Sequence, residues 1–141
     1  MNRTELVKSM SQAATELLHE KGYISFVDLL MRMGKLSRED HEAWRNRKVG
    51  YLERAIKLNL AQVNHLLRNL QQNSGKGGLK ASKTAYLSWG KGAKTALRFS
   101  KSGDPHLEAA YAMHFLRAQK AKPQTPAATV NKEQAQEDPA P

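Results

Sequence analysis

The stretch KTAYLSWGKGAKTALRFSK, residues 83–101, decides how the rest of the chain is interpreted. Its first part is rich in the aromatic and aliphatic residues typical of a strand. Its last part alternates, with Leu97 and Phe99 on one face and Arg98 on the other. The tract Gly90-Lys91-Gly92 between the two parts is a turn signal. The pattern predicts a β-hairpin at about residues 83–101, with Leu97 and Phe99 packed on a core.

Helical periodicity surrounds this predicted hairpin on both sides. Ser25 and Ser37 each stand three residues before an aspartate, a spacing typical of a capped helix start. Asp104 followed by Pro105 is a further start signal, because it combines a capping side chain with proline at the first helical position. We expect helices at about 4–21, 25–34, 38–48, 51–72 and 105–120, with a glycine-containing loop at 73–78 after the longest helix.

These elements indicate one small domain of mixed class. The predicted fold is mainly α with one β-hairpin (α+β), possessing a helix-turn-helix or winged-helix-like order and a C-terminal closing helix. Residues 1–122 form the expected basic domain. Residues 123–141 consist mainly of Pro, Ala, Gln, Thr and Glu and offer no apolar stripe, so a disordered tail is predicted there.

Composition excludes several classes of function. The chain has no cysteine, which rules out disulfides and thiolate metal sites. Neither a signal-peptide core nor a membrane-spanning apolar stretch is found, so a cytoplasmic protein without a membrane partner is expected. The five histidines show no i,i+3 or i,i+4 pair, and no P-loop or HExxH motif occurs. We therefore predict no catalytic residue, no metal and no cofactor.

Charge is the strongest functional signal. The 141 residues include 23 Lys plus Arg and 13 Asp plus Glu, a formal net charge of +10. Between Lys76 and Lys101 there are seven positive charges, and no acidic residue occurs from Asn73 to Gly103. Such a concentration is relieved when a phosphate backbone binds and releases its counterions. The stretch predicts a polyanionic partner, and duplex DNA is the expected one.

A second basic group lies in the predicted helix 38–48. Arg45, Arg47 and Lys48 would belong to the second helix of a helix-turn-helix, where arginine can read guanine edges. The alternative is a solvated polar face of an amphipathic helix. Trp89 could stack on a base or cover the helices. The residues predicted to contact nucleic acid are Arg45, Arg47, Lys48, Lys76, Lys80, Lys83, Trp89, Lys91, Lys94, Arg98 and Lys101.

Two functions compete on this evidence. The first is a nucleic-acid-binding protein with a regulatory or accessory role, which contacts phosphates through the hairpin and the basic helix. The alternative is a protein-interaction module that docks an acidic surface of a larger bacterial or phage-related complex. Binding to a membrane surface is a weaker interpretation, because the most basic region is not predicted to be an amphipathic helix.

Three segments resemble segments of short uncharacterised bacterial proteins. They are GYISFVDLLMRMGKLS (22–37), TAYLSWGKG (84–92) and LRFSKSGDP (97–105). The resemblance covers about residues 20–115 and implies a bacterial source. No assigned activity comes with it, and it therefore implies no catalytic or binding residue.

Overall fold

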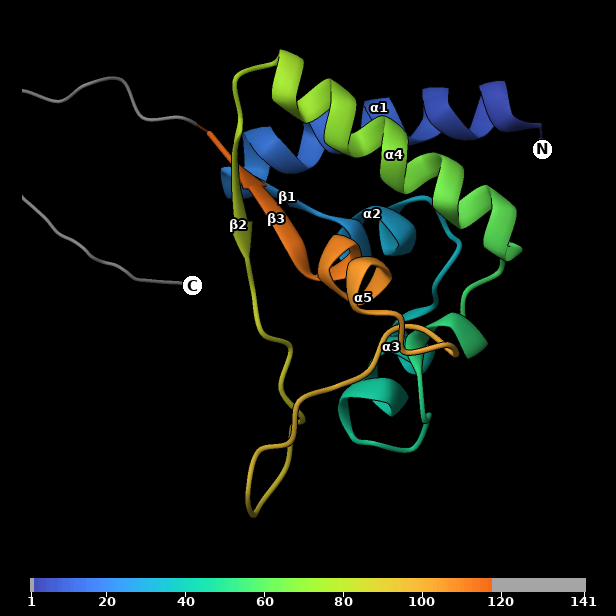
Figure 1. Ribbon diagram of the computed structural model, residues 1–141, viewed down its shortest axis with the longest axis vertical. Helices are drawn as coiled ribbons and strands as arrows, with labels where there is room; N and C mark the ends of the chain where they lie inside the picture. The colour runs from blue at the N-terminus through green and yellow to red at the C-terminus, as the bar shows by residue number, and fades with distance from the viewer. Residues whose placement is uncertain (1, 118–141) are drawn as a thin grey trace, which may run out of the picture.

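The computed structural model describes residues 2–117 (Figure 1). This part of the chain combines helices with a small antiparallel sheet, which confirms the mixed α+β class. The winged-helix order has no counterpart among these findings and stays a prediction. The elements are α1 (Arg3–Lys21), β1 (Tyr23–Ser25), α2 (Phe26–Arg32), α3 (Arg38–Arg45), the 3-10 turn η1 (Leu52–Arg54), α4 (Leu60–Lys76), β2 (Lys80–Lys83), α5 (Pro105–Ala112) and β3 (Met113–Leu116).

A side-chain cap begins each of the first three helices, and the caps predicted at Ser25 and Ser37 are confirmed. Asn2 accepts the N–H of Glu5 and forms a capping box with it at the start of α1. Ser25 and Ser37 accept N–H groups three residues later, at 3.1 and 3.0 Å, and begin α2 and α3. Gly22 has a left-handed φ of 80° and ends α1. Helices α2 and α3 are shorter than predicted.

The predicted helix at 51–72 is wrong at both ends. Helix α4 begins at Leu60, because Asn59 and Gln62 form a capping box there. It then continues through the expected loop to Lys76. Its stop lies at Gly78, whose φ of 75° supports two hydrogen bonds back to the last turn. The apolar periodicity of the sequence predicted one helix, whereas the cap at Asn59 separates the segment before it from α4.

The segment before α4 is a short turn and a loop. Leu52 and Ile56 are buried, which explains why they seemed to continue the apolar stripe of the helix. The first two N–H groups of η1 donate instead to the carbonyls of Arg98 and Phe99, at 3.1 and 2.9 Å. The segment is therefore fixed by the same stretch that was predicted to form a hairpin.

The predicted hairpin at 83–101 is present only as an irregular antiparallel loop, which we name the 84–99 loop. Its two arms share one isolated bridge, between Leu87 and Ala96. Beside the bridge, the N–H of Leu97 donates to the carbonyl of Tyr86 at 2.8 Å. Neither arm is a regular strand. Figure 1 shows the loop projecting from the lower end of the molecule.

The arms stay irregular because their backbone groups bond to other elements. The N–H of Thr84 donates to the carbonyl of Ala112 in α5, at 3.0 Å. The N–H of Trp89 donates to the carbonyl of Arg45 in α3, at 2.8 Å. These donors are lost to the pairing of the arms, which keeps only the bonds from Leu97 to Tyr86 and from Ser88 to Thr95.

The regular sheet is made by strands that the sequence analysis did not predict. Its order is β1-β3-β2, and both pairings are antiparallel. The central strand β3 falls where a helix was expected to continue to residue 120, although the capped start at Asp104 is confirmed. Pairing on both edges of β3 satisfies its backbone, which overrides weak helical periodicity. The predicted tail at 123–141 lies outside the described residues.

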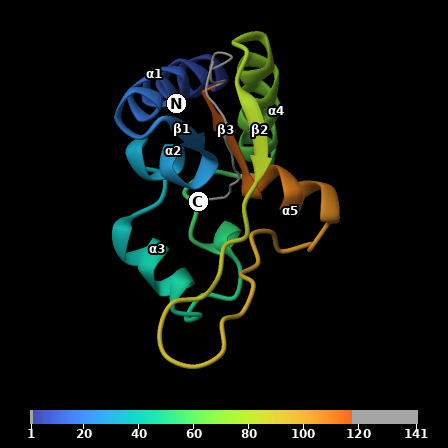
Figure 2. The ribbon, with the colours of Figure 1, turned by 90° about the vertical axis from the view of Figure 1, so that its left-hand side faces the viewer.

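A single aromatic core connects the two ends of the molecule. Phe26, Trp44 and Tyr111 are fully buried, and Phe99 stacks on Tyr111 with ring centres 5.3 Å apart. The predicted inward face of Leu97 and Phe99 is confirmed, since Phe99 is buried and Leu97 packs against the core. Figures 1 and 2 place α3 and the 84–99 loop at the end opposite α1 and α4. Within residues 2–117, no helix combines the length and hydropathy needed to cross a bilayer.

Candidate nucleic-acid interface

Helix α3 packs through one aromatic residue, and three basic residues lie at and just beyond its C-terminal end. Trp44 is fully buried, and its indole N–H donates to the carbonyl of Arg98 at 2.8 Å. Two acidic residues lie in the first turn of α3, and Arg45 lies in the last. Arg47 and Lys48 follow and are exposed. The C-terminal end of α3 therefore carries three positive charges next to the 84–99 loop.

Arg47 has a strained backbone at the end of α3. Its φ is 62°, and among the described residues it is the non-glycine residue with a positive φ. Its N–H donates to the carbonyl of Trp44, and the N–H of Lys48 donates to that of Ala43, at 3.0 and 2.8 Å. Glycine usually occupies this position, because a side chain there costs about 1–2 kcal/mol. An arginine at this position keeps a positive charge at some cost in stability.

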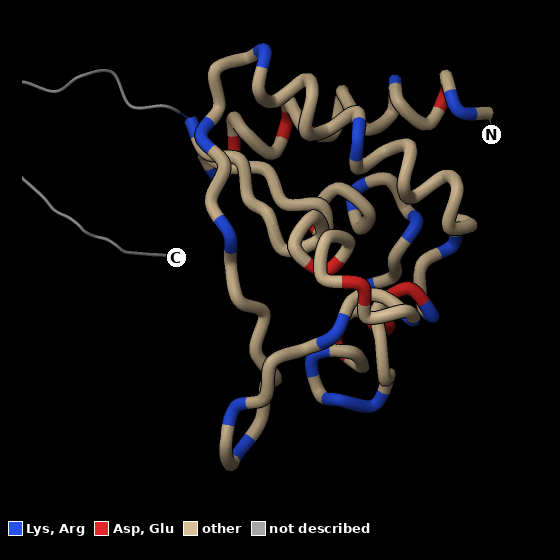
Figure 3. The backbone as a smooth tube through the Cα atoms, in the orientation of Figure 1, with Lys and Arg blue, Asp and Glu red and all other residues tan. Residues whose placement is uncertain are grey.

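The structure brings together the two basic groups that the sequence analysis predicted separately. The main-chain N–H of Trp89 donates to the carbonyl of Arg45, and an Arg45 Nη donates to the carbonyl of Leu87 at 2.9 Å. Arg47 donates to the Thr95 hydroxyl at 3.2 Å. Figure 3 shows Lys and Arg on both adjoining loops at this end. We name this surface the basic lobe, which comprises Arg47, Lys48, Trp89, Lys91 and Lys94.

Arg45 is partly buried beside the lobe, and its guanidinium packs among aromatic rings; its predicted contact with nucleic acid stays a prediction. The guanidinium carbon lies 4.8, 5.3 and 5.7 Å from the ring centres of Tyr86, Trp89 and Trp44. Burial lowers the pKa of the guanidinium, and its Nε is buried without a hydrogen-bond partner. Arg45 therefore positions the rings and the loop by cation–π contact and hydrogen bonding.

Arg98 is exposed, and its guanidinium is bonded to the main chain of the residues that follow it. Its Nε donates to the carbonyl of Ser100 at 2.8 Å, and its Nη2 donates to the carbonyl of Lys101. These two bonds use two of the five N–H donors of the guanidinium and fix its direction. The side chain of Lys101 stays exposed, while its main-chain N–H donates to Glu53 at 3.0 Å.

Two carboxylates hold the end of the loop, and the sequence analysis missed both. Glu108 accepts the N–H groups of Phe99 and Ser100 and the Ser100 hydroxyl, at 2.6–3.2 Å. Glu53 accepts the Tyr111 hydroxyl at 2.9 Å, and burial and that carboxylate raise the pKa of Tyr111. The sequence contains a hint of this role. No acidic residue lies between Glu53 and Asp104, so Glu53 and the acidic residues of α5 flank the acid-free stretch.

The remaining predicted lysines lie apart from the basic lobe. Lys76 ends α4, and Lys80 and Lys83 bound the edge strand β2, where all four residues are exposed. Lysines on an edge strand commonly prevent pairing with another chain. Figure 1 shows β2 running from the end of α4 toward the 84–99 loop. The fold does not join these lysines with the basic lobe in one site.

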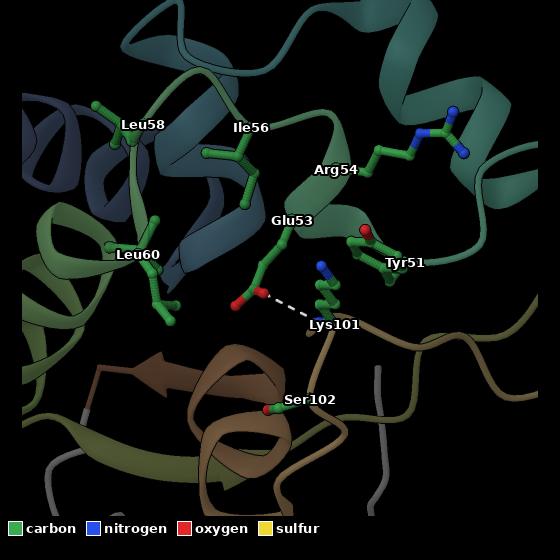
Figure 4. A pocket seen from close by; sticks show the side chains of 9 residues that line it. Tyr51, Glu53, Arg54, Ile56, Leu58, Leu60, Lys101 and Ser102 are labelled. Carbon is green, nitrogen blue, oxygen red and sulfur yellow. Dashed lines mark hydrogen bonds between the residues drawn. The ribbon is translucent and has the colours of Figure 1, made fainter.

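A pocket of about 600 Å³ opens elsewhere, beside η1 and the start of α4. Its walls are mainly apolar, and Leu60 at its edge is 52% exposed. Figure 4 shows the Glu53 carboxylate directed into it and bonded to the main chain of Lys101. Sequence reasoning missed this pocket because it assigned the segment to a continuous helix. The lining residues are Tyr51, Glu53, Arg54, Ile56, Leu58, Leu60, Val63, Lys101 and Ser102.

Within residues 2–117, no three His, Asp or Glu side chains gather closely enough to hold a metal ion.

His114 is held by two aromatic residues. Its Nε2 lies 2.8 Å from the Tyr86 hydroxyl, its ring stacks on Tyr23 at 5.1 Å, and burial lowers its pKa. These contacts join β3 to β1 and to the 84–99 loop.

Comparison of the chain with protein-family models, with curated proteins and with solved structures gave no match. The resemblance to short bacterial proteins therefore stays a prediction. The chemistry of the basic lobe rests on the residues and contacts described above.

Proposed function

We propose that this chain binds nucleic acid, DNA foremost, by placing the basic lobe against phosphates, in a regulatory or accessory role. The observation that carries the proposal is the joining of α3 and the 84–99 loop, which concentrates Arg47, Lys48, Lys91 and Lys94 on one end. No salt bridge among the described residues involves these four side chains. Their charges are thus available to displace counterions from a phosphate backbone.

Arg47 gives the proposal a second support. Its left-handed backbone costs free energy that glycine would avoid. Strain of this kind is concentrated at functional sites in proteins. Arg47 also donates to Thr95, which orients its charge toward the loop that carries Lys91 and Lys94. The proposal gives the chain a binding role and assigns it no reaction.

The test is a salt titration of binding to labelled DNA, with duplex and single strands of about 20 nucleotides. We expect binding that weakens steeply between about 50 and 200 mM salt. The variant Lys48→Ala/Lys91→Ala/Lys94→Ala should bind at least about tenfold more weakly, and its salt slope should fall by up to about three charges. Salt-independent binding, or no binding at the lowest salt, would refute the proposal.

A matched control removes the same charge elsewhere. Arg3, Lys8 and Lys57 are exposed and lie outside the basic lobe. The variant Arg3→Ala/Lys8→Ala/Lys57→Ala should lose less than about threefold in affinity. If both triple variants lose equally, only total charge matters and the basic lobe is not the site.

The pocket supports a second candidate, docking of an acidic protein partner. Its apolar floor and the exposed Leu60 suit a partner's apolar side chain. Arg54 and Lys101 line it and favour acidic residues beside that side chain. A photocrosslinker at position 60 should capture one stoichiometric partner after nuclease treatment, while a crosslinker at exposed Ser11 should not. Loss of the crosslink in Lys101→Glu would assign the partner to this pocket.

A further inference from the structure

The first arm of the 84–99 loop has an apolar outer face. Tyr86 and Ser88 are 7% and 3% exposed, while Leu87 and Trp89 are 43% and 45% exposed. In an extended segment, residues two apart point to the same side, so Leu87 and Trp89 share the outward face. Together they form a small apolar patch of the kind that a ligand can cover.

Trp89 is held in place although nearly half of it is exposed. Its main-chain N–H donates to the carbonyl of Arg45, and the Arg45 guanidinium lies over its ring, 5.3 Å from the ring centre. The His41 ring meets it at 86° and 5.6 Å. A ring that is fixed before binding loses little conformational entropy when a ligand stacks on it. This differs from a mobile surface tryptophan and from a buried core residue.

Cations and open backbone surround this aromatic face. Gly90 and Gly92 have φ of 96° and 94°, and a Cβ added to either would meet nothing within 4 Å. Lys94 donates to the carbonyl of Gly90 at 2.9 Å, and Lys91 lies exposed between the glycines. Little side-chain bulk therefore separates Trp89 from the lysines. An aromatic ring beside basic residues is the arrangement that binds single strands, by stacking bases and tracking phosphates.

We infer that the basic lobe prefers nucleic acid with unpaired bases, and that one base stacks on Trp89 while Leu87 contacts its neighbour. The inference rests on the proposed nucleic-acid binding and replaces intact duplex as the preferred ligand. In a duplex both faces of each base are covered by stacked neighbours, and only base edges reach the grooves. The face formed by Leu87 and Trp89 gains apolar burial only when a base is free.

The experiment compares ligands that differ in one feature. Anisotropy is measured with an oligothymidylate of about 16 nucleotides, the same sequence as a duplex, and an abasic strand of equal length. Oligouridylate distinguishes RNA from DNA as the source of the strand. We expect oligothymidylate to bind about 5- to 150-fold tighter than the abasic strand, the range given by stacking one base. It should also bind tighter than the duplex.

Protein variants complete a double-mutant cycle. Trp89→Ala should lose that same factor on oligothymidylate and less than about threefold on the abasic strand, while Trp89→Phe keeps most of the affinity. Leu60→Ala, at an exposed apolar residue outside the lobe, should change neither. The ligand comparison needs no variant, so a poorly folded Trp89→Ala leaves the inference testable.

The outcomes separate the inference from the proposal on which it rests. Equal affinity for oligothymidylate, duplex and abasic strand would overturn base stacking and leave phosphate contact in place. No binding to any of the three at low salt would overturn both. A loss in Trp89→Ala that is equal for the normal and abasic strands would show that Trp89 supports the loop and does not stack on a base.

Discussion

The Arg45 carbonyl accepts the main-chain N–H of Trp89 at 2.8 Å, while the Arg45 guanidinium lies 5.3 Å from the centre of the Trp89 ring. One residue thus holds a tryptophan by both its main chain and its side chain. The contact joins the end of α3 to the first arm of the 84–99 loop, 44 positions apart by their numbers. The position of the exposed ring therefore depends on a charge that faces inward.

Replacing Arg45 with lysine should lower stability, because an ammonium cannot lie flat among three rings and also reach the carbonyl of Leu87. We expect a loss of about 1–2 kcal/mol in the free energy of unfolding, measured by urea denaturation. Arg38→Lys, at an exposed position on the same helix, should change it by less than about 0.5 kcal/mol. Equal effects would show that the ring contacts add nothing.

Replacing Arg47 with glycine should separate stability from binding. Glycine relieves the positive φ of 62°, so the variant should be as stable as the parent or up to about 1 kcal/mol more stable. Its affinity for DNA should fall, because one cation of the basic lobe is removed. Thermal denaturation and the salt titration measure the two effects.

Arg47→Lys is the control, since it keeps both the charge and the strain. It should retain the affinity of the parent within about threefold and its stability within about 0.5 kcal/mol. A clear loss of stability in Arg47→Gly would mean that the hydrogen bond to Thr95 matters more than the backbone conformation. Unchanged affinity in that variant would remove Arg47 from the proposed site.

Local chemistry explains which features the sequence could reveal. Ser25, Ser37 and Asp104 begin helices, because a capping side chain acts on an N–H only three residues away. The cap at Asn59 acts in the same way, but an apolar stripe that seemed continuous concealed it. Features decided within one helical turn were therefore predictable from residues alone.

Long-range pairing explains what the sequence could not reveal. Strand β3 forms because β1 and β2 pair with it from opposite edges. No pattern within Met113–Leu116 predicts a strand there. The basic lobe similarly depends on where α3 meets the 84–99 loop. Sequence analysis named its lysines, yet it could not show that the Arg45 guanidinium packs among aromatic rings or that Arg98 donates to main-chain carbonyls.

The environment of His114 makes stability depend on pH. Burial lowers its pKa, Arg45 and Lys21 lower it further, and Asp28 opposes them. Because the folded pKa lies below the unfolded value of about 6.5, its contribution is complete above that pH and is lost as pH falls below it. We expect the free energy of unfolding to decrease between about pH 7 and pH 5.

His114→Gln should measure the share of that decrease that comes from His114, since burial also lowers the pKa of His41. The variant is expected to be less stable at neutral pH, since it loses the stacking on Tyr23, but to lose less stability on acidification. His106→Gln, at an exposed histidine, should keep the full pH dependence of the parent. If His114→Gln shows the same acid loss as the parent, the dependence comes from other groups. Urea denaturation at several pH values makes the comparison.

Removal of the Glu108 carboxylate should have the largest effect on the fold. Glu108→Ala leaves the N–H groups of Phe99 and Ser100 without their acceptor in a partly buried place. We expect a loss of about 2–4 kcal/mol, because each buried donor left unpaired costs about 1–3 kcal/mol. Glu108→Gln keeps one acceptor oxygen and should lose about half as much. Exposed Glu42→Ala is the control and should stay within about 0.5 kcal/mol. Chemical denaturation gives these values, and hydrogen exchange at residues 99–100 locates the loss.

A Glu108→Ala variant that is as stable as the Glu42→Ala control would contradict this prediction. Water or another group would then accept the N–H groups of Phe99 and Ser100 in place of the Glu108 carboxylate.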